Sequence, residues 1–112
     1  MSPAADERVD RTLAALADPA RRRAVELLGA SPRRAGELAA ALAVSPSVMS
    51  RHLRVLRRSE LVTESSPPDD ARVRIYALRD GATDHVRAWL DEVERGWVDQ
   101  LASLKAHVER DP

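Results

Sequence analysis

The chain has 112 residues, of which 44% are hydrophobic and 32% charged, which suits one globular domain with a single small core. It contains no cysteine, which excludes disulfides and thiolate metal sites, and no apolar run of the roughly 18 residues that a membrane span needs. The N-terminal segment carries acids where a signal peptide needs a basic start and an apolar stretch, so we expect a cytoplasmic protein without membrane contact.

Two helices are predicted before the loop at residues 30–32. The first has apolar residues at helical spacing and ends at Asp18. Asp18 followed by Pro19 is typical of an N-cap and a first helical turn, so the second helix is expected to run from there to Gly29. A run of three arginines in the second helix is interpreted as solvated surface or as pairing within the chain. The apolar residues of the first helix are Val9, Leu13 and Leu16, and the arginines are Arg21, Arg22 and Arg23.

The next two predicted helices form a helix-turn-helix. Residues 37–42 are rich in alanine and predict a short helix, and Ser45 is placed to cap a following helix that has Pro46 at its first position. In this fourth helix, apolar residues recur at i, i+4 and i+7 and must face the core, which turns serines and arginines toward solvent. The core positions are Met49, Leu53 and Leu56, and the exposed positions are Ser47, Ser50, Arg51, Arg54 and Arg58.

A β-hairpin is predicted after the fourth helix. Residues 61–63 are expected to pair with residues 73–78, and the turn lies at residues 65–70 because Pro67 and Pro68 cannot join a strand ladder. Alternation along the second strand predicts one half-buried face. The residues of that face are Val73, Ile75 and Ala77.

A long final helix is predicted from about Thr83. Its apolar residues follow one another at steps of three or four and form a seam that a domain of this size cannot cover alone. A ligand pocket wall or a membrane-active face is the alternative, but the heptad-like spacing and the acidic flanks favour packing against another helix. We therefore predict a homodimer. The seam contains Val86, Leu90, Val93, Trp97, Leu101, Leu104 and Val108, with Trp89 beside it.

The charge distribution is uneven although the net charge is zero. Residues 33–58 contain six arginines and one acid, whereas residues 88–112 contain three bases and six acids. Such an asymmetry can attract a polyanion to one face, and the alternative is an ordinary solvated surface. No Gly-rich phosphate loop, paired-histidine motif or Ser-His-acid arrangement is present, and the adjacent carboxylates Asp69 and Asp70 lie on the hairpin turn, so we expect no enzyme and no cofactor.

Three segments resemble the ArsR/SmtB winged-helix repressors. They are LADPARRRAVELL at residues 16–28, GELAAALAVSPSVMSRHLRVLRRSELV at residues 36–62 and RIYAL at residues 74–78, in the order that the family has them. The resemblance implies a dimer formed by the first and last helices, a recognition helix at residues 46–58, a wing at the hairpin and ligand-responsive repression.

The chain departs from this family where its members bind metals. Members that sense soft metals have paired cysteines in the third helix, and the aligned residues here are Ala39 and Ala41. A second family site uses Asp and His ligands on the last helix, but His85 and His107 are 22 residues apart and lack the spacing of those ligands. We therefore expect no metal. The acidic turn of the wing also argues against contact of the tip itself with the minor groove.

Together these features predict a mainly α, winged helix-turn-helix fold of about five helices with a two-stranded hairpin wing. Residues 1–112 form one domain, with dimerisation helices at about 6–17 and 83–109. We expect a homodimeric repressor that reads double-stranded operator DNA with the fourth helix. The alternative is a winged-helix module that binds another protein without specific DNA binding. A small-molecule effector stays open.

The residues expected at each surface follow from these elements. Ser45 is both the expected cap and a candidate phosphate ligand, and His52, either packed near the turn or in contact with DNA, is included by its position in the family. The expected DNA contacts are Ser45, Ser47, Ser50, Arg51, His52, Arg54, Arg72 and Arg74. The expected dimer contacts are Val9, Leu13, Leu16, Val86, Leu90, Val93, Trp97, Leu101 and Leu104.

Overall fold

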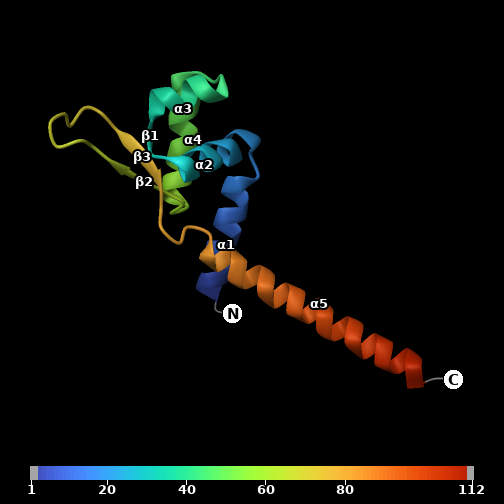
Figure 1. Ribbon diagram of the computed structural model, residues 1–112. Coiled ribbons are helices and arrows are strands. Elements are labelled where there is room, and N and C mark those ends of the chain that lie inside the picture. The colour runs from blue at the N-terminus through green and yellow to red at the C-terminus, as the bar shows by residue number, and fades with distance from the viewer. Residues whose placement is uncertain (1–2, 111–112) are drawn as a thin grey trace.

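The computed structural model describes residues 3–110, so the outermost two residues at each end of the predicted domain lie outside the described residues. Within this range the chain forms five helices and three strands (Figure 1), which confirms the predicted elements to within a few residues at their ends. The helices are α1 (Pro3–Leu16), α2 (Pro19–Ala30), α3 (Ala35–Leu42), α4 (Pro46–Arg58) and α5 (Asp84–Arg110). The strands are β1 (Arg33–Arg34), β2 (Val62–Ser65) and β3 (Ile75–Leu78).

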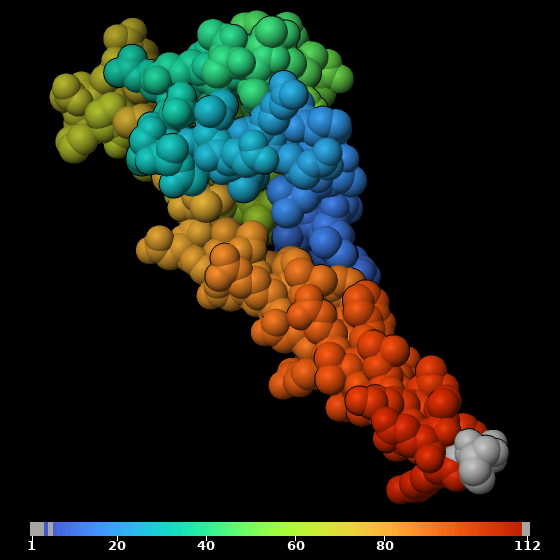
Figure 2. Space-filling view, turned by 45° about the vertical axis from the view of Figure 1, so that its right-hand side comes forward, coloured from blue at the N-terminus to red at the C-terminus, as the bar shows by residue number. Residues whose placement is uncertain are grey.

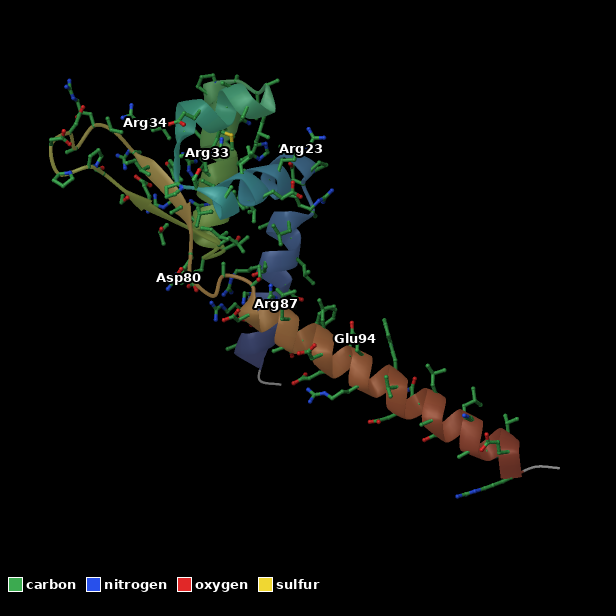
Figure 3. The ribbon with its side chains drawn as sticks, in the orientation of Figure 1. Arg23, Arg33, Arg34, Asp80, Arg87 and Glu94 are labelled. Atoms are coloured by element: carbon green, nitrogen blue, oxygen red, sulfur yellow. The ribbon has the colours of Figure 1, made fainter. Side chains whose placement is uncertain are left out.

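The predicted N-cap of α2 is present, and the arginine run beside it is used within the chain. The Asp18 carboxylate accepts hydrogen bonds from the backbone N–H groups of Ala20 and Arg21 at 2.8 and 3.3 Å. Arg21 and Arg22 donate to the last carbonyl groups of α1, among them Ala15 O at 2.6 Å, where positive charge also complements the helix dipole. Two of the three arginines therefore join α1 to α2, and Arg23 is left exposed on the outer side of α2 (Figure 3).

Asp18 is held in its charged form by this arrangement. Desolvation by itself would raise the pKa of the carboxyl group, but the two backbone hydrogen bonds and the nearby His52 and Arg21 outweigh that effect. The pKa of Asp18 is consequently lowered from its ordinary value, as expected for a carboxylate that accepts backbone N–H groups at a helix start.

The strands form one antiparallel sheet in the order β1-β3-β2. The predicted hairpin is confirmed, with Val62 opposite Leu78 and Ser65 opposite Ile75. The two-residue strand β1, which pairs with β3 through Arg33 and Tyr76, is an addition that the sequence pattern did not indicate.

The predicted half-buried residues of the second strand, Val73, Ile75 and Ala77, are half-buried in the structure. The sequence analysis did not assign Tyr76, which lies between Ile75 and Ala77 and is the buried residue of β3. Its large apolar ring joins Leu61 in the hydrophobic core.

The hydrophobic core lies between α2, α3, α4 and the sheet. The three apolar residues predicted to face inward from α4 are fully buried there, and Leu38 of α3 and Leu61 join them. Since α4 is amphipathic, burial of one face fixes which side chains the other face presents. The three buried residues of α4 are Met49, Leu53 and Leu56.

The helix α5 leaves this body as a rod (Figures 1 and 2). The chain measures 74 by 28 by 22 Å, and its radius of gyration of 19.6 Å exceeds the roughly 13 Å of a compact domain of this length. Among the described residues of α5 none is buried, and Trp97 and Leu101 are 61% and 66% exposed. From Trp97 to Val108 the apolar seam is therefore exposed, whereas Val86 and Val93 near the start of α5 are half-buried. Within the described residues, no helix is long and apolar enough to cross a membrane.

The first turns of α5 rest on α1. The buried hydroxyl of Thr12 lies 2.6 Å from His85 Nε2, and Asp80 and Arg87 flank the bend that leads from β3 into α5 (Figure 3). Burial lowers the pKa of His85, and the positive charge of Arg8 adds to this, although Asp84 and Glu60 oppose it.

We expect the stability of the chain to depend on pH through His85. Because the folded pKa of this residue lies below its unfolded value of about 6.5, the stabilisation is complete above the unfolded value and is lost as the pH falls from that value through the folded pKa. In the variant His85→Gln, the glutamine side chain can still form a hydrogen bond with Thr12, but it does not titrate. Urea unfolding at a series of pH values and one protein concentration should show the free energy of unfolding falling more steeply below about pH 6.5 in the wild type than in the variant. Parallel curves would contradict this role of His85.

Candidate nucleic-acid interface

The start of α4 is built by a serine cap. Ser45 Oγ accepts a hydrogen bond from the backbone N–H of Val48 at 3.2 Å, and Pro46 occupies the first turn, which confirms the predicted cap. Ser47 Oγ lies 3.3 Å from Ser45 Oγ, and both serines are exposed. Hydroxyl groups and free backbone N–H groups at a helix start are suited to an anionic ligand.

The exposed face of α4 carries its arginines as predicted. Ser50, Arg51 and Arg54 are exposed, and within residues 3–110 neither Arg51 nor Arg54 has an acid within ion-pair distance. Their guanidinium groups therefore keep their donors for an external partner. This is a polar, positively charged helix face that stands free of the fold, with the dimensions of an element that fits a DNA major groove.

His52 lies at the border of this face. The ring is half-buried, and its Nδ1 atom is 3.5 Å from Arg21 Nη1 of α2. The side chain thus occupies the junction of α2 and α4, beside the stripe of exposed serines and arginines and not on it. A contact of His52 with DNA stays a prediction.

The two predicted wing arginines each have an acidic partner. Arg72 lies 3.4 Å from Asp70 near the turn of the wing, and Arg74 forms an ion pair with Glu64 of β2. The hydrogen bond and the charge of Glu64 raise the pKa of Arg74 above its already high value, so this guanidinium is always charged. Both side chains are on the wing surface, but their positive charges are partly neutralised there.

Arg57 and Glu64 were missed by the sequence reasoning. Arg57 Nη1 lies 2.5 Å from Glu64 Oε2, so one carboxylate holds an arginine of α4 and an arginine of the wing. The strand register explains one of these pairs, because Glu64 is opposite Tyr76 and Arg74, two positions from Tyr76, is its diagonal cross-strand neighbour. The predicted first strand ended at residue 63, so no register was predicted for Glu64.

The residues predicted for the dimer surface have different exposures. Val9 is only 3% exposed and packs inside its own chain, so it is unavailable to a partner. The others lie on α1 and α5, and their part in a dimer surface stays a prediction. Leu16, Val86 and Val93 are half-buried, and Leu13, Leu90, Trp97, Leu101 and Leu104 are exposed.

The positions considered for metal ligands in the sequence analysis include Ala39, Ala41 and His85. Ala39 is buried in α3 and Ala41 is exposed on it, and His85 is hydrogen bonded to Thr12. Within residues 3–110 no three His, Cys, Asp or Glu side chains gather into a cluster that could hold an ion.

Comparison with known proteins decides the family. Residues 18–64, which span α2 to most of β2, match the family described as bacterial regulatory protein, arsR family. The HTH-type transcriptional regulator Rv2034 of Mycobacterium tuberculosis is 42% identical to this chain over 92 residues, which are 82% of this chain and 80% of that protein. The chain belongs to the arsR family. It is therefore a transcriptional regulator with a DNA-binding helix-turn-helix, and not an enzyme.

Solved structures of the arsR family have the same fold. An ArsR-like transcriptional regulator from Rhodococcus sp. RHA1 matches with a TM-score of 0.76 at 25% identity, covering 88% of this chain and 91% of that one. The ArsR family transcriptional regulator RHA00566 matches with a TM-score of 0.74 at 28% identity, covering 82% and 92%. The winged helix-turn-helix architecture predicted for this arsR-family chain is thereby confirmed.

We expect substitution of the α4 arginines to weaken DNA binding without unfolding the chain. Each bidentate contact of an arginine with a guanine contributes about 1–3 kcal/mol, so Arg51→Ala and Arg54→Ala should each lose about that amount and the double variant more. Fluorescence anisotropy with labelled duplex measures the loss, and circular dichroism checks folding. The matched control is Arg23→Ala, which removes an exposed arginine from the outer side of α2. Equal losses in the control and the α4 variants would refute the assignment.

Proposed function

We propose that the protein is a homodimeric repressor whose two α4 helices enter successive major grooves of a roughly palindromic operator. The observation that carries this proposal is the outer face of α4. Arg51 and Arg54 are exposed there and unpaired within residues 3–110, because the opposite face of the same helix is buried in the core.

The proposed dimer rests on the uncovered seam of α5. Its seven apolar residues would forfeit on the order of 5–10 kcal/mol if they stayed half exposed in water. In the proposed dimer, the α5 helices of the two protomers pack against each other in antiparallel orientation, so that each seam covers the other. Helix α1 of each protomer also joins this interface. The two-fold symmetry of such a dimer relates two copies of α4. If each copy enters one of two successive major grooves, the operator half-sites are about one helical turn, roughly 34 Å, apart.

Repression is the activity that the resemblance to the ArsR/SmtB family implies. A dimer that occupies its operator excludes other proteins from that stretch of duplex, and this requires no chemistry beyond binding. The proposed DNA contacts are Ser45, Ser47, Ser50, Arg51, His52, Arg54, Arg72 and Arg74.

We expect the dimer to retain specific fragments of its own genome, and the affinity to depend strongly on salt. If a dimer neutralises about eight phosphates, the logarithm of affinity should fall with the logarithm of salt concentration with a slope of roughly −7. Sequencing of retained fragments and anisotropy titrations at several salt concentrations measure both properties. A slope near zero and no enriched fragment would favour a protein-binding module instead.

The dimer should dissociate when charge is placed on the seam. Leu101→Glu removes an apolar contact worth about 1.5–3 kcal/mol from each protomer and also forces two like charges together across the axis. Analytical ultracentrifugation should show a monomer where the wild type is a dimer. Ala102→Glu is the matched control, because it adds the same charge one residue further, at an exposed position off the seam, and it should stay dimeric. If both variants remain dimeric, the dimer interface does not include this seam.

A further inference from the structure

A buried acid joins the recognition helix to the wing. The side chain of Glu64 is only 8% exposed, and it lies between Arg57 of α4 and Arg74 of the wing. Its Oε2 atom pairs with Arg57 and its Oε1 atom pairs with Arg74. An acid in such a place is costly unless it is paired, and here each carboxylate oxygen has its own guanidinium partner.

The acid lines a hollow between α4 and the wing that has the chemistry of a phosphate site. The other polar groups that line the hollow come from α4 and from the wing. Both arginines that pair with Glu64 remain more than half exposed. A guanidinium has five donors, so each arginine retains N–H groups after its bond to Glu64. The lining residues are Ser50, Arg54, Arg57, Glu64, Arg74 and Tyr76.

The position of the hollow relates it to duplex DNA. With α4 in the major groove and the wing beside it, the phosphate backbone that separates the two grooves passes over the junction of the two elements. Because the carboxylate of Glu64 holds the guanidinium groups of Arg57 and Arg74, the two groups can bind one phosphate between them. This step rests on the proposed function, because it assumes that α4 enters the major groove.

We propose that Glu64 is a positioning residue of the DNA-binding surface. It holds Arg57 and Arg74 as a clamp for one backbone phosphate at the junction of α4 and the wing. The same carboxylate cancels one of the two positive charges, which limits attraction to duplex of any sequence. Glu64 thus increases the preference for the operator over other DNA without touching the DNA itself.

The test is the isosteric variant Glu64→Gln in the full-length protein. Loss of the negative charge raises the charge of each site from +1 to +2. Because the proposed homodimer carries two such sites, the salt slope on mixed-sequence duplex should become steeper by about 1.8. The affinity of the variant relative to that of the wild type should therefore rise by roughly 60-fold when the salt concentration is lowered from 1 M to 0.1 M. Affinity for a fragment that the wild type retains should not rise with it, because the arginines lose their common anchor. The ratio of the two affinities is therefore expected to fall by roughly the same factor.

The chain offers a matched control in Glu60→Gln. Glu60 also lies between two arginines, Arg8 at 3.6 Å and Arg79 at 3.9 Å, but its side chain is 49% exposed and its partners belong to the junction with α1 and α5. The two variants change the net charge equally. Only Glu64→Gln should alter the salt slope and the ratio of affinities, and equal behaviour of the two variants would overturn the proposal.

A second variant keeps the test valid if Glu64→Gln does not fold. Arg57 is more than half exposed, and Arg57→Gln removes two phosphate contacts from the proposed homodimer, so it should flatten the salt slope on mixed-sequence duplex by about 1.8. An arginine that serves only the fold would leave the slope unchanged. Thermal melting by circular dichroism verifies folding of each variant. Failure of the proposed function gives a different result, since the wild type itself would then show no enriched fragment and a slope near zero.

Discussion

The amphipathic division of α4 is the constraint on which the rest of the structure depends. Met49, Leu53 and Leu56 fill the centre of the core, so the helix cannot rotate without exposing them. The opposite face is thereby held in one orientation, and Arg51 and Arg54 point outward with no acid of the described chain to bind them. Core packing thus fixes the helix face that contacts DNA in the proposed function, and the exposed arginine side chains are ordered only on binding.

Local signals in the sequence were sufficient for much of this fold. The caps Asp18 and Ser45, each followed by proline, placed two helix starts correctly because capping depends on neighbouring residues alone. The spacing of apolar residues placed the buried face of α4 and the uncovered seam of α5 for the same reason.

Features that depend on distant contacts were not predictable in the same way. The burial of Tyr76 in β3 was not predicted because a tyrosine suits either face of a strand, and the face it takes depends on what packs opposite. The strand β1 exists only because β3 lies beside it. Glu64 escaped notice because its significance comes from two arginines brought together by the fold, and the three arginines of α2 gave no sign that two of them close the end of α1.

The body and the rod are joined at a junction whose rigidity comes from packing more than from charge. Arg8 and Arg79 both approach Glu60 at the end of α4, but these side chains are partly exposed, and such ion pairs contribute little in water. The buried hydrogen bond between Thr12 and His85 is different, because a buried hydroxyl without a partner would cost about 1–3 kcal/mol. The orientation of α5 relative to α4 is therefore set chiefly by the contact of α1 with α5. In the proposed dimer that orientation determines how far apart the two α4 helices lie, and the hydrogen bond between Thr12 and His85 is one of the contacts that fix it.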